Sequence, residues 1–263
     1  HELLDAKEIR RRYPPLVPSH DLVALYEPMA GFVDPEQCTL AYQQLAAKLG
    51  AELHFNEPML SWESTANGVR VTTTRATYEA DSLVLAPGPW APGVFGDLAL
   101  PLAIERQVMF WLDPIGGVDA FHPDRFPIYI WELEDGAHFY GFPSQGDGVK
   151  VACYHGGAFC DAESVDRNVS ADEIARMRAI VADRIPALRG PLRNAVTCMY
   201  TNTPDLDFIL GTHPRHANVV IASPCSGHGY KFASVIGEIL ADLATEGTTP
   251  HPIARFTPSR FAR

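Results

Sequence analysis

The segment SPCSGHGYK, residues 223–231, contains residue types that suit the binding of an anion. An apolar strand pattern precedes it and a helix pattern follows it, and open α/β sheets bind ligands at the carboxyl ends of their strands. Gly227 and Gly229 would allow a ligand to approach the backbone closely, and the amino end of the helix would present unpaired N–H groups. Lys231 is unfavourable to the helix dipole at this position, so it favours a bound anion; the alternative is a solvated lysine after a tight turn.

Lys150 and Cys198 are two further side chains that could take part in chemistry. Lys150 lies in the strand-like segment VKVACYH, ahead of Tyr154 and His155. A lysine in such a pattern more often lies on an edge strand or points outward. Cys198 lies in VTCMYT, where an inert buried thiol is the more common outcome, and no surrounding pattern supports a Cys/His hydrolase.

Common catalytic signatures are absent from the 263 residues: the sequence contains no GxGxxG, GxxxxGK[ST], GxSxG or HExxH. His213 and His216 have a spacing that could suit a metal, but Pro214 indicates a turn, and no acidic or cysteine partner stands at ligand spacing. We therefore predict no metal site.

Composition favours a small-molecule partner. The chain is 46% hydrophobic and 20% charged, which excludes a disordered protein, and 21 Lys and Arg against 32 Asp and Glu give a net charge of -11. This acidic balance disfavours nucleic acid and anionic membrane surfaces. No run approaches the roughly 18 apolar residues of a membrane helix. Five cysteines without a CxxC pair suit a reducing compartment, so we predict a cytoplasmic protein.

The apolar spacing predicts elements of two kinds. Residues 34–50 form a helix pattern with Asp34 as N-cap and Gly50 at its end. Strand patterns follow at residues 52–55, 69–73 and 83–85. The last of these runs into APGPW, as a buried parallel strand runs into a ligand-facing loop. This part of the chain is therefore predicted to be α/β.

Between residues 100 and 200 the pattern changes to that of an antiparallel sheet. The strand-like segments are IERQVMFWL, FPIYIWEL, AHFYGFP, VKVACYH and AVTCMYT. One helix interrupts them, opened by a capping box of Ser170 and Glu173, with Met177, Val181 and Ile185 on its apolar face. After residue 218 the α/β pattern returns, with the strand NVVIAS and a helix over about residues 230–245.

Taken together, these segments resemble one family. CMYTNTPDLDFIL, HPRHANVVIA and SGHGYKFASVIGEILADLA are similar to the carboxy-terminal part of the monomeric sarcosine oxidase and N-methyltryptophan oxidase family, which are FAD-dependent amine oxidases of the D-amino-acid-oxidase-like superfamily. LPLAIERQVMFWLDP and YGFPSQGDGVKVACYHGG resemble earlier segments in the same order. The resemblance implies an α/β plus α+β fold. In it, a glutathione-reductase-type FAD domain (34–99 and 201–263), incomplete at its amino terminus, is interleaved with an antiparallel-sheet substrate domain (1–33 and 100–200).

The resemblance also implies roles for individual residues. Cys198 corresponds to the cysteine that forms a thioether to the flavin, Lys150 to the lysine that promotes reaction of reduced flavin with oxygen, and Lys231 to the lysine that pairs with the substrate carboxylate. Tyr140 and Tyr200 resemble tyrosines that line the substrate cavity. The remaining expected cofactor neighbours are Met59, Ala86, Pro87, Gly88, Trp90, Gly227, His228, Gly229 and also Lys231, with His228 a catalytic candidate as well.

The implied reaction is oxidation of a secondary (N-methyl) amino acid such as sarcosine or N-methyltryptophan. Flavin accepts the hydride equivalent, dioxygen is the acceptor and hydrogen peroxide the product. We expect a monomer that acts on a small amine. The alternatives are a sister FAD-dependent amine dehydrogenase, or a flavin-free, non-catalytic remnant or interaction module.

Two features depart from the family pattern. The family has a histidine four residues after the oxygen-activating lysine, whereas Tyr154 stands at that spacing here and His155 follows it. Either a bulge restores His155 to the site or Tyr154 replaces it. The family's GxGxxG unit and the arginine-bearing segment after it are also missing, and the first residue is His1 rather than Met. We therefore expect the sequence to be a fragment, the carboxy-terminal two-thirds of such an oxidase, to bind FAD poorly and to turn over little.

Overall fold

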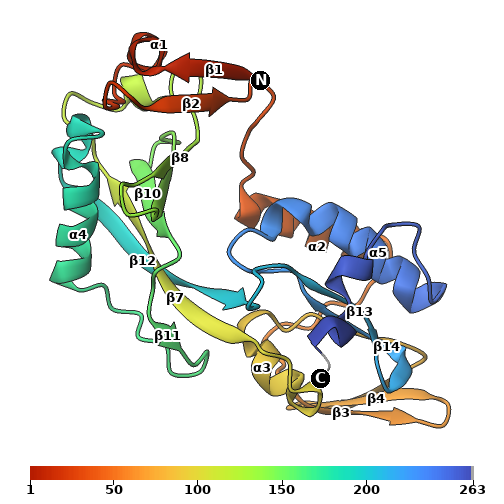
Figure 1. The fold of residues 1–263 in the computed structure, drawn as a ribbon. Coiled ribbons are helices and arrows are strands. Elements are labelled where there is room, and N and C mark those ends of the chain that lie inside the picture. Colours follow the sequence, from red (N-terminus) through yellow and green to blue (C-terminus); the bar gives the residue numbers. More distant parts are fainter. Residues whose placement is uncertain (262–263) are drawn as a thin grey trace. The chain divides into compact units, whose positions relative to one another are not determined.

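The computed structural model describes residues 1–261, and the chain forms two compact units that are discontinuous in sequence. Unit 1 comprises His1–Phe32 and Glu105–Met199. Unit 2 comprises Val33–Ile104 and the chain from Tyr200 onward. Two long strands cross the boundaries between them, and Figure 1 shows the course of the chain.

Unit 1 is built on a six-stranded antiparallel sheet. Its strands are β7 (Ala103–Leu112), β8 (Tyr129–Glu132), β9 (His138–Phe142), β10 (Val149–Tyr154), β11 (Phe159–Cys160) and β12 (Leu192–Asn202). The strand order is β11-β7-β10-β9-β8, and β12 also pairs with β7. A separate hairpin of β1 (Glu2–Asp5) and β2 (Val23–Tyr26) flanks α1 (Ala6–Arg12). The five segments predicted as antiparallel strands thus all contain strands of one sheet.

The helix α4 (Ala171–Ala182) covers one face of this sheet, as Figure 1 shows. Its predicted capping box is present: the Glu173 N–H donates to Ser170 Oγ at 3.2 Å, and the Ser170 N–H donates to Glu173 Oε2 at 2.8 Å. Met177 and Val181 are buried in the core against the sheet. Ile185 also joins this core, but it does so from beyond the helix end.

The central strand β10 separates core residues from residues on the opposite face. Val149 and Val151 are fully buried in the core, so alternation directs Lys150 and Tyr154 to the other side. β10 pairs with both β7 and β9. Of the two common placements for such a lysine, the edge strand is wrong, because β10 is internal to the sheet; the other holds, because Lys150 points away from the core.

Unit 2 contains a small mixed sheet of order β13-β14-β6. β13 (Ile209–His213) is antiparallel to β14 (His216–Ser223), which is parallel to β6 (Leu83–Leu85). The segments predicted as α/β before and after the antiparallel part therefore share one sheet. Val219 and Ile221 pack in one core cluster, while Val220 packs against α5 (Ala233–Thr245). Because β14 is buried on both faces, its sequence is a continuous apolar run.

The remaining elements of unit 2 surround this sheet. A second sheet has the order β3-β4-β5, formed by β3 (Met59–Thr65), β4 (Gly68–Thr73) and β5 (Thr77–Ala80). The short helix α3 (Ala91–Val94) follows β6, and 3-10 turns lie at Gly88–Trp90, Gly96–Leu98, Tyr230–Phe232, Ala254–Phe256 and Pro258–Phe261. Two further 3-10 turns, at Asp119–Phe121 and Pro186–Arg189, belong to unit 1. The helix predicted over about 230–245 is thus a 3-10 turn followed by α5.

The helix α2 (Pro35–Lys48) has the predicted start, because Asp34 Oδ1 accepts the Gln37 N–H at 2.9 Å. It contains no buried residue, and Leu45 is 53% exposed. Its apolar positions therefore contribute little to the core of unit 2. None of the helices in residues 1–261 has the length and apolar character needed to span a membrane.

The strand predicted at residues 52–55 is wrong. Asn56 adopts a left-handed backbone, with φ 54°, which ends extended structure directly after this segment. His54 contacts Glu57 through Nδ1 and Oε2 at 3.1 Å, and the Tyr78 hydroxyl donates to Glu57 Oε1 at 2.8 Å. Local polar contacts therefore replace a sheet ladder here.

Candidate active site

Lys150 is a cation held between aromatic rings on the sheet face away from the core of unit 1. Its partners across the ladders are Trp111 on β7 and Phe142 on β9. The Nζ atom lies 5.3 Å from the Trp111 ring centre and 5.2 Å from that of Phe142. Cation–π attraction from both sides restricts where the ammonium can move. The sheet therefore supplies a positive charge at a fixed place.

Cys198 on β12 is half-buried and lies within electrostatic reach of Lys150. Burial raises the pKa of the Cys198 thiol, and the Lys150 charge acts in the opposite direction. The thiol form is favoured at neutral pH as a result. The structure thus brings together the two reactive side chains that sequence analysis selected in this unit.

Two tyrosines share this face with Lys150. Tyr140 pairs with Ala152 across β9 and β10, so both side chains point to the Lys150 side, and the Tyr140 ring meets Phe142 edge-on at 5.8 Å. Tyr154 follows by alternation along β10. Burial and the nearby Glu105 charge raise the pKa of its phenol, which therefore stays protonated at neutral pH.

His155 lies directly beyond the end of β10 and does not continue the alternation. Its backbone is left-handed, with φ 62°, and its Nδ1 atom lies 2.9 Å from Glu105 Oε2. On β7, Val108 and Phe110 face the core, so Glu105 lies on the opposite side, which is the side of Trp111. Tyr154 and His155 therefore both lie on the face that bears Lys150. Tyr154 reaches it from the strand, and His155 reaches it from the turn that follows.

In unit 2, two loops leave the same edge of a parallel pair of strands. Leu85 pairs with Ile221, so the carboxyl ends of β6 and β14 are neighbours. The first loop contains the predicted residues Ala86, Pro87, Gly88 and Trp90. The second is the turn 224–231. Met59 lies at the start of β3 and packs against a core cluster that includes Leu85 and Ala91, on either side of the first loop.

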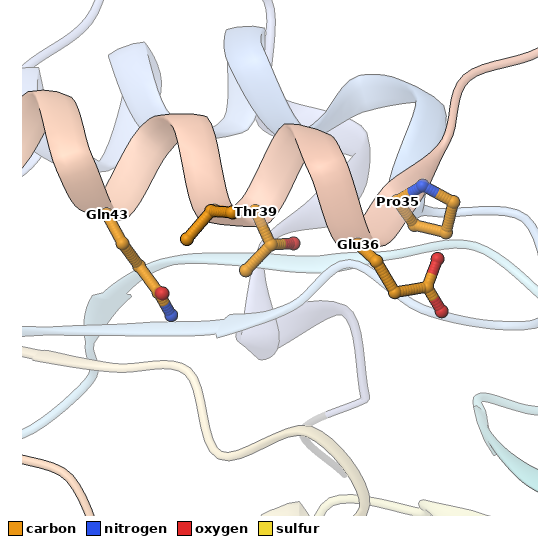
Figure 2. A pocket seen from close by; sticks show the side chains of 5 residues that line it. Pro35, Glu36, Thr39 and Gln43 are labelled. Carbon is orange, nitrogen blue, oxygen red and sulfur yellow. The ribbon is translucent and has the colours of Figure 1, made fainter.

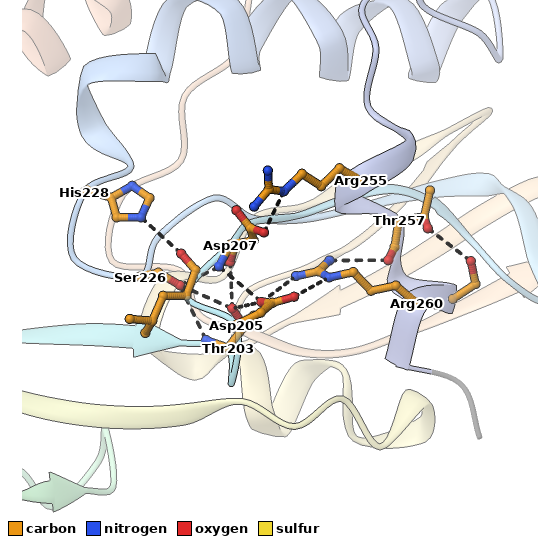
Figure 3. Close-up of polar contacts among 10 residues, drawn as sticks. Thr203, Asp205, Asp207, Ser226, His228, Arg255, Thr257 and Arg260 are labelled. Atoms are coloured by element: carbon orange, nitrogen blue, oxygen red, sulfur yellow. Dashed lines mark hydrogen bonds and ion pairs between the residues drawn. The ribbon is translucent and has the colours of Figure 1, made fainter.

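A polar network holds the second loop in place, as Figure 3 shows. Ser226 is completely buried, with φ 48°, and its N–H donates to Thr201 O at 2.9 Å. The Ser226 hydroxyl donates to Asp207 O at 3.2 Å, and the Thr203 hydroxyl donates to the same carbonyl at 2.7 Å. His228 Nε2 lies 3.1 Å from Leu206 O. Because a carbonyl only accepts, Nε2 carries a proton, and Nδ1 is the basic nitrogen of the neutral ring.

Arg255 and Arg260 bind the side chains of Asp207 and Asp205, which lie on either side of Leu206. Arg260 Nε contacts Asp205 Oδ2 at 2.9 Å, and Arg255 Nε contacts Asp207 Oδ2 at 2.8 Å (Figure 3). The Arg260 guanidinium holds the pKa of Asp205 far below its usual range. The chain end therefore fixes the loop that supports His228.

Gly227 and Gly229 are required by packing within unit 2. Gly227 has φ 75°, and a Cβ there would lie 2.8 Å from the Tyr200 ring. A Cβ at Gly229 would lie 1.6 Å from Pro224 O. Packing against β12 therefore requires glycine at position 227, and the turn itself requires glycine at position 229. Gly88 differs, because it has φ 56° and a Cβ there would meet no atom within 4 Å.

Lys231 lies in the 3-10 turn before α5 and is exposed. Its Nζ atom lies 5.7 Å from the Phe232 ring centre, and it forms no ion pair within residues 1–261. α5 starts at Ala233 without a side-chain cap. The lysine is therefore a solvated cation next to an uncapped helix start.

A shallow depression of about 350 Å³ lies along α2 and contains none of the predicted site residues. Figure 2 shows Pro35, Glu36, Thr39 and Gln43 along this side of the helix. The Tyr230 hydroxyl donates to Pro35 O at 2.7 Å. It therefore anchors the turn before α5 to the first turn of α2.

Sequence reasoning did not select Glu105, Ser226 or Thr203. Glu105 offers a weak signal, because a carboxylate within a strand pattern must find partners if it is buried. Ser226 and Thr203 give no such signal, since small polar residues are common in turns.

Comparisons with known proteins identify the class of protein to which this fold and these site residues belong. A family model described as "FAD dependent oxidoreductase" matches residues 1–243. "Monomeric sarcosine oxidase" of Streptomyces avermitilis is 52% identical over 266 residues, covering 100% of this chain and 69% of that protein. "N-methyl-L-tryptophan oxidase" of Salmonella newport is 31% identical over 264 residues, covering 100% of this chain and 70% of that protein. The chain belongs to the monomeric sarcosine oxidase and N-methyltryptophan oxidase family of FAD-dependent oxidoreductases, which confirms the resemblance.

Solved structures with low sequence identity show the same fold. L-proline dehydrogenase from P. horikoshii has a TM-score of 0.84 at 22% identity, with 99% of this chain and 68% of that chain covered. The open form of NikD, an amino acid oxidase, has a TM-score of 0.82 at 24% identity, with 98% and 68% covered. The predicted fold class is therefore confirmed.

Proposed function

We propose that this protein oxidises the carbon–nitrogen bond of a secondary (N-methyl) amino acid, such as sarcosine or N-methyltryptophan, with dioxygen as acceptor and hydrogen peroxide as product. The family and the names of the two relatives support this substrate class. The observation behind this proposal is that a fixed cation, Lys150, lies within electrostatic reach of the half-buried Cys198 in unit 1.

The residues present fit a flavin cofactor. Gly88 leaves open space beside a loop at the carboxyl edge of β6 and β14, which is where such sheets receive nucleotides. We assign this edge, with Ala86, Pro87 and Trp90, to the cofactor, and Met59 to its adenine end. Gly227, His228 and Gly229 contribute the second loop. The sequence carries no GxGxxG, so no pyrophosphate ligand is assigned.

FAD, when bound, supplies a two-electron acceptor for the hydride equivalent from the carbon beside nitrogen. We propose that Cys198 holds the cofactor covalently through its Sγ atom. The two aromatic rings fix Lys150 Nζ, so its charge needs no reorganisation when negative charge develops on oxygen. This cation is our candidate for the group that favours reduction of dioxygen.

Lys231 is our candidate for binding the substrate carboxylate. It is an exposed cation beside the uncapped start of α5. An anion there would be attracted by the lysine and by the partial positive charge of the helix amino end. Tyr140 and Tyr200 are assigned to the substrate-lining surface. His228 keeps Nε2 protonated by its bond to Leu206 O, which leaves Nδ1 to accept a proton or a hydrogen bond.

The cellular location and the oligomeric state are two further proposals. The five cysteines are free thiols, which suits a reducing compartment, so we propose a cytoplasmic location. We propose a monomer, as the name of the 52% identical relative states for that protein.

Substrates with and without a carboxylate test the assignment of Lys231. The protein is supplied with saturating FAD, and oxidation of sarcosine is compared with that of N-methylated amines that lack the carboxylate. Lys231→Met should raise KM for sarcosine and leave KM for the amines unchanged, and Lys48→Met, on the last turn of α2, is the matched control. Equal KM changes for both substrates would exclude a carboxylate contact.

Acid precipitation of protein incubated with saturating FAD tests the covalent link. Flavin should remain with the precipitated protein in the wild type and in Cys160→Ser, and it should be released in Cys198→Ser. Retention in Cys198→Ser would place the link elsewhere, and release in the wild type would exclude a covalent flavin.

A further inference from the structure

Glu105 is a buried carboxylate whose two oxygens have different partners. It is 4% exposed. Its Oε1 atom accepts from the Gln107 Nε2–H at 2.7 Å and from the Gly157 N–H at 2.8 Å. Its Oε2 atom faces His155 Nδ1 at 2.9 Å. Two N–H donors on one oxygen favour the ionised carboxylate, and an ionised carboxylate can only accept.

The backbone after β10 holds His155 against this carboxylate. His155 and Gly156 are both left-handed, with φ 62° and φ 83°. Gly157 lies so close to β7 that a Cβ there would stand 1.8 Å from Arg106 O. The turn therefore packs directly against the backbone of β7. This packing fixes both the Gly157 N–Glu105 contact and the His155–Glu105 contact.

We propose that Glu105 is the positioning residue of His155 and fixes its neutral imidazole as the tautomer that carries its proton on Nδ1. Since Oε2 accepts, Nδ1 must donate, and Nε2 is then the basic nitrogen. Tyr154 is a second titratable neighbour, with its ring 4.3 Å from that of His155. With this tautomer, His155 is able to accept a proton or a hydrogen bond at Nε2.

The consequence for catalysis rests on the proposed function. His155 lies at the end of the face that bears Lys150, and a histidine held by a carboxylate presents one defined nitrogen to its surroundings. Loss of the carboxylate should therefore change which nitrogen is basic while the ring stays in place.

Glu105→Gln tests this assignment sharply, because Oε1 is pinned by two donors. The amide oxygen must stay with Gln107 and Gly157, so the amide NH₂ group replaces Oε2 opposite His155. Nδ1 must then accept, and the imidazole proton moves to Nε2. Glu105→Asp keeps a carboxylate and should keep the proton on Nδ1. Glu134→Gln removes an equal charge from an exposed residue of unit 1 that binds Arg184, and it is the matched control.

The readout is the ¹⁵N shift of each imidazole nitrogen in histidine-labelled protein at about pH 8.5, above the ordinary histidine pKa of about 6.5. The His155 signals are those that His155→Gln removes. We expect a protonated Nδ1 in the wild type and in Glu134→Gln, and a protonated Nε2 in Glu105→Gln. A protonated Nε2 in the wild type would overturn the assignment, as would an unchanged tautomer in a folded Glu105→Gln.

Amine oxidation gives a second, separable readout. Glu105→Gln should lower kcat by about 10- to 100-fold, and Glu105→Asp should retain more activity. If the tautomer changes as expected but the wild type oxidises no amine, the proposed function fails and the role of Glu105 as a positioning residue stands. If the wild type is active and the tautomer does not respond to Glu105→Gln, the role of Glu105 fails alone.

Discussion

Replacement of Gly227 by alanine should destabilise unit 2, because Gly227 lies in the second loop, the turn 224–231. Gly227 has φ 75°, and left-handed backbone costs a residue with a side chain about 1–2 kcal/mol. The added Cβ would stand 2.8 Å from Tyr200 Cε2, and such overpacking costs about 1–3 kcal/mol. Together these terms give about 2–5 kcal/mol, a large part of the roughly 5–15 kcal/mol that holds a protein folded.

Calorimetry measures this loss. For a chain of this size 1 kcal/mol corresponds to about 2–4 °C, so Gly227→Ala should lower Tm by about 4–20 °C. Gly237→Ala is the matched control, because Gly237 lies within α5 and a Cβ there meets no atom within 4 Å. That variant should be unchanged or stabilised by about 0.5–1 kcal/mol, since alanine is the better helix former. Equal Tm values for Gly227→Ala and the wild type would refute the packing argument.

Three further predictions concern stability. Ser170→Ala should cost about 1 kcal/mol by removing the capping box of α4, read from the denaturant midpoint; an unchanged midpoint would show that the cap is redundant. Met177→Ala, at a core position 3% exposed, should cost about 2–5 kcal/mol, whereas Leu45→Ala on α2, 53% exposed, should change stability by less than about 0.5 kcal/mol; similar losses for both would contradict the burial described. Arg260 holds the pKa of Asp205 below its ordinary value of 3.8, so the pair stabilises the fold at neutral pH and this contribution is lost as pH falls through the lowered pKa. Asp205→Asn should therefore be less stable than the wild type at pH 7, with the gap closing in acid; a gap that persists at low pH would assign the effect to packing.

Local signals in the sequence predicted much of the secondary structure. Asp34 and the Ser170–Glu173 pair mark helix starts because capping acts within four residues. The strand-like segments between residues 100 and 200 indicated the antiparallel sheet of unit 1. The segment 52–55 shows the limit of such patterns, because the left-handed Asn56 and a local polar cluster prevented the expected strand.

The contacts that build the candidate site join residues far apart in sequence. Glu105 and His155 are 50 residues apart, and Asp205 and Arg260 are 55 apart. No local pattern specifies such pairs, because sheet pairing and the path of the chain end bring them together. The packing of Gly227 against Tyr200 has the same origin. Sequence patterns therefore selected His155 and Gly227, whereas their partners Glu105 and Tyr200 are set by the fold.

The proposed reaction is an oxygen-dependent oxidation of an N-methyl amino acid that relies on Lys150. The most direct measurement is the hydrogen peroxide formed per molecule of sarcosine or N-methyltryptophan consumed, with added FAD, in the wild type and in Lys150→Met. We expect one peroxide per amine in the wild type, and a rate of peroxide formation about 10²- to 10³-fold lower in Lys150→Met. Amine oxidation without peroxide, or equal peroxide rates in the two proteins, would contradict it.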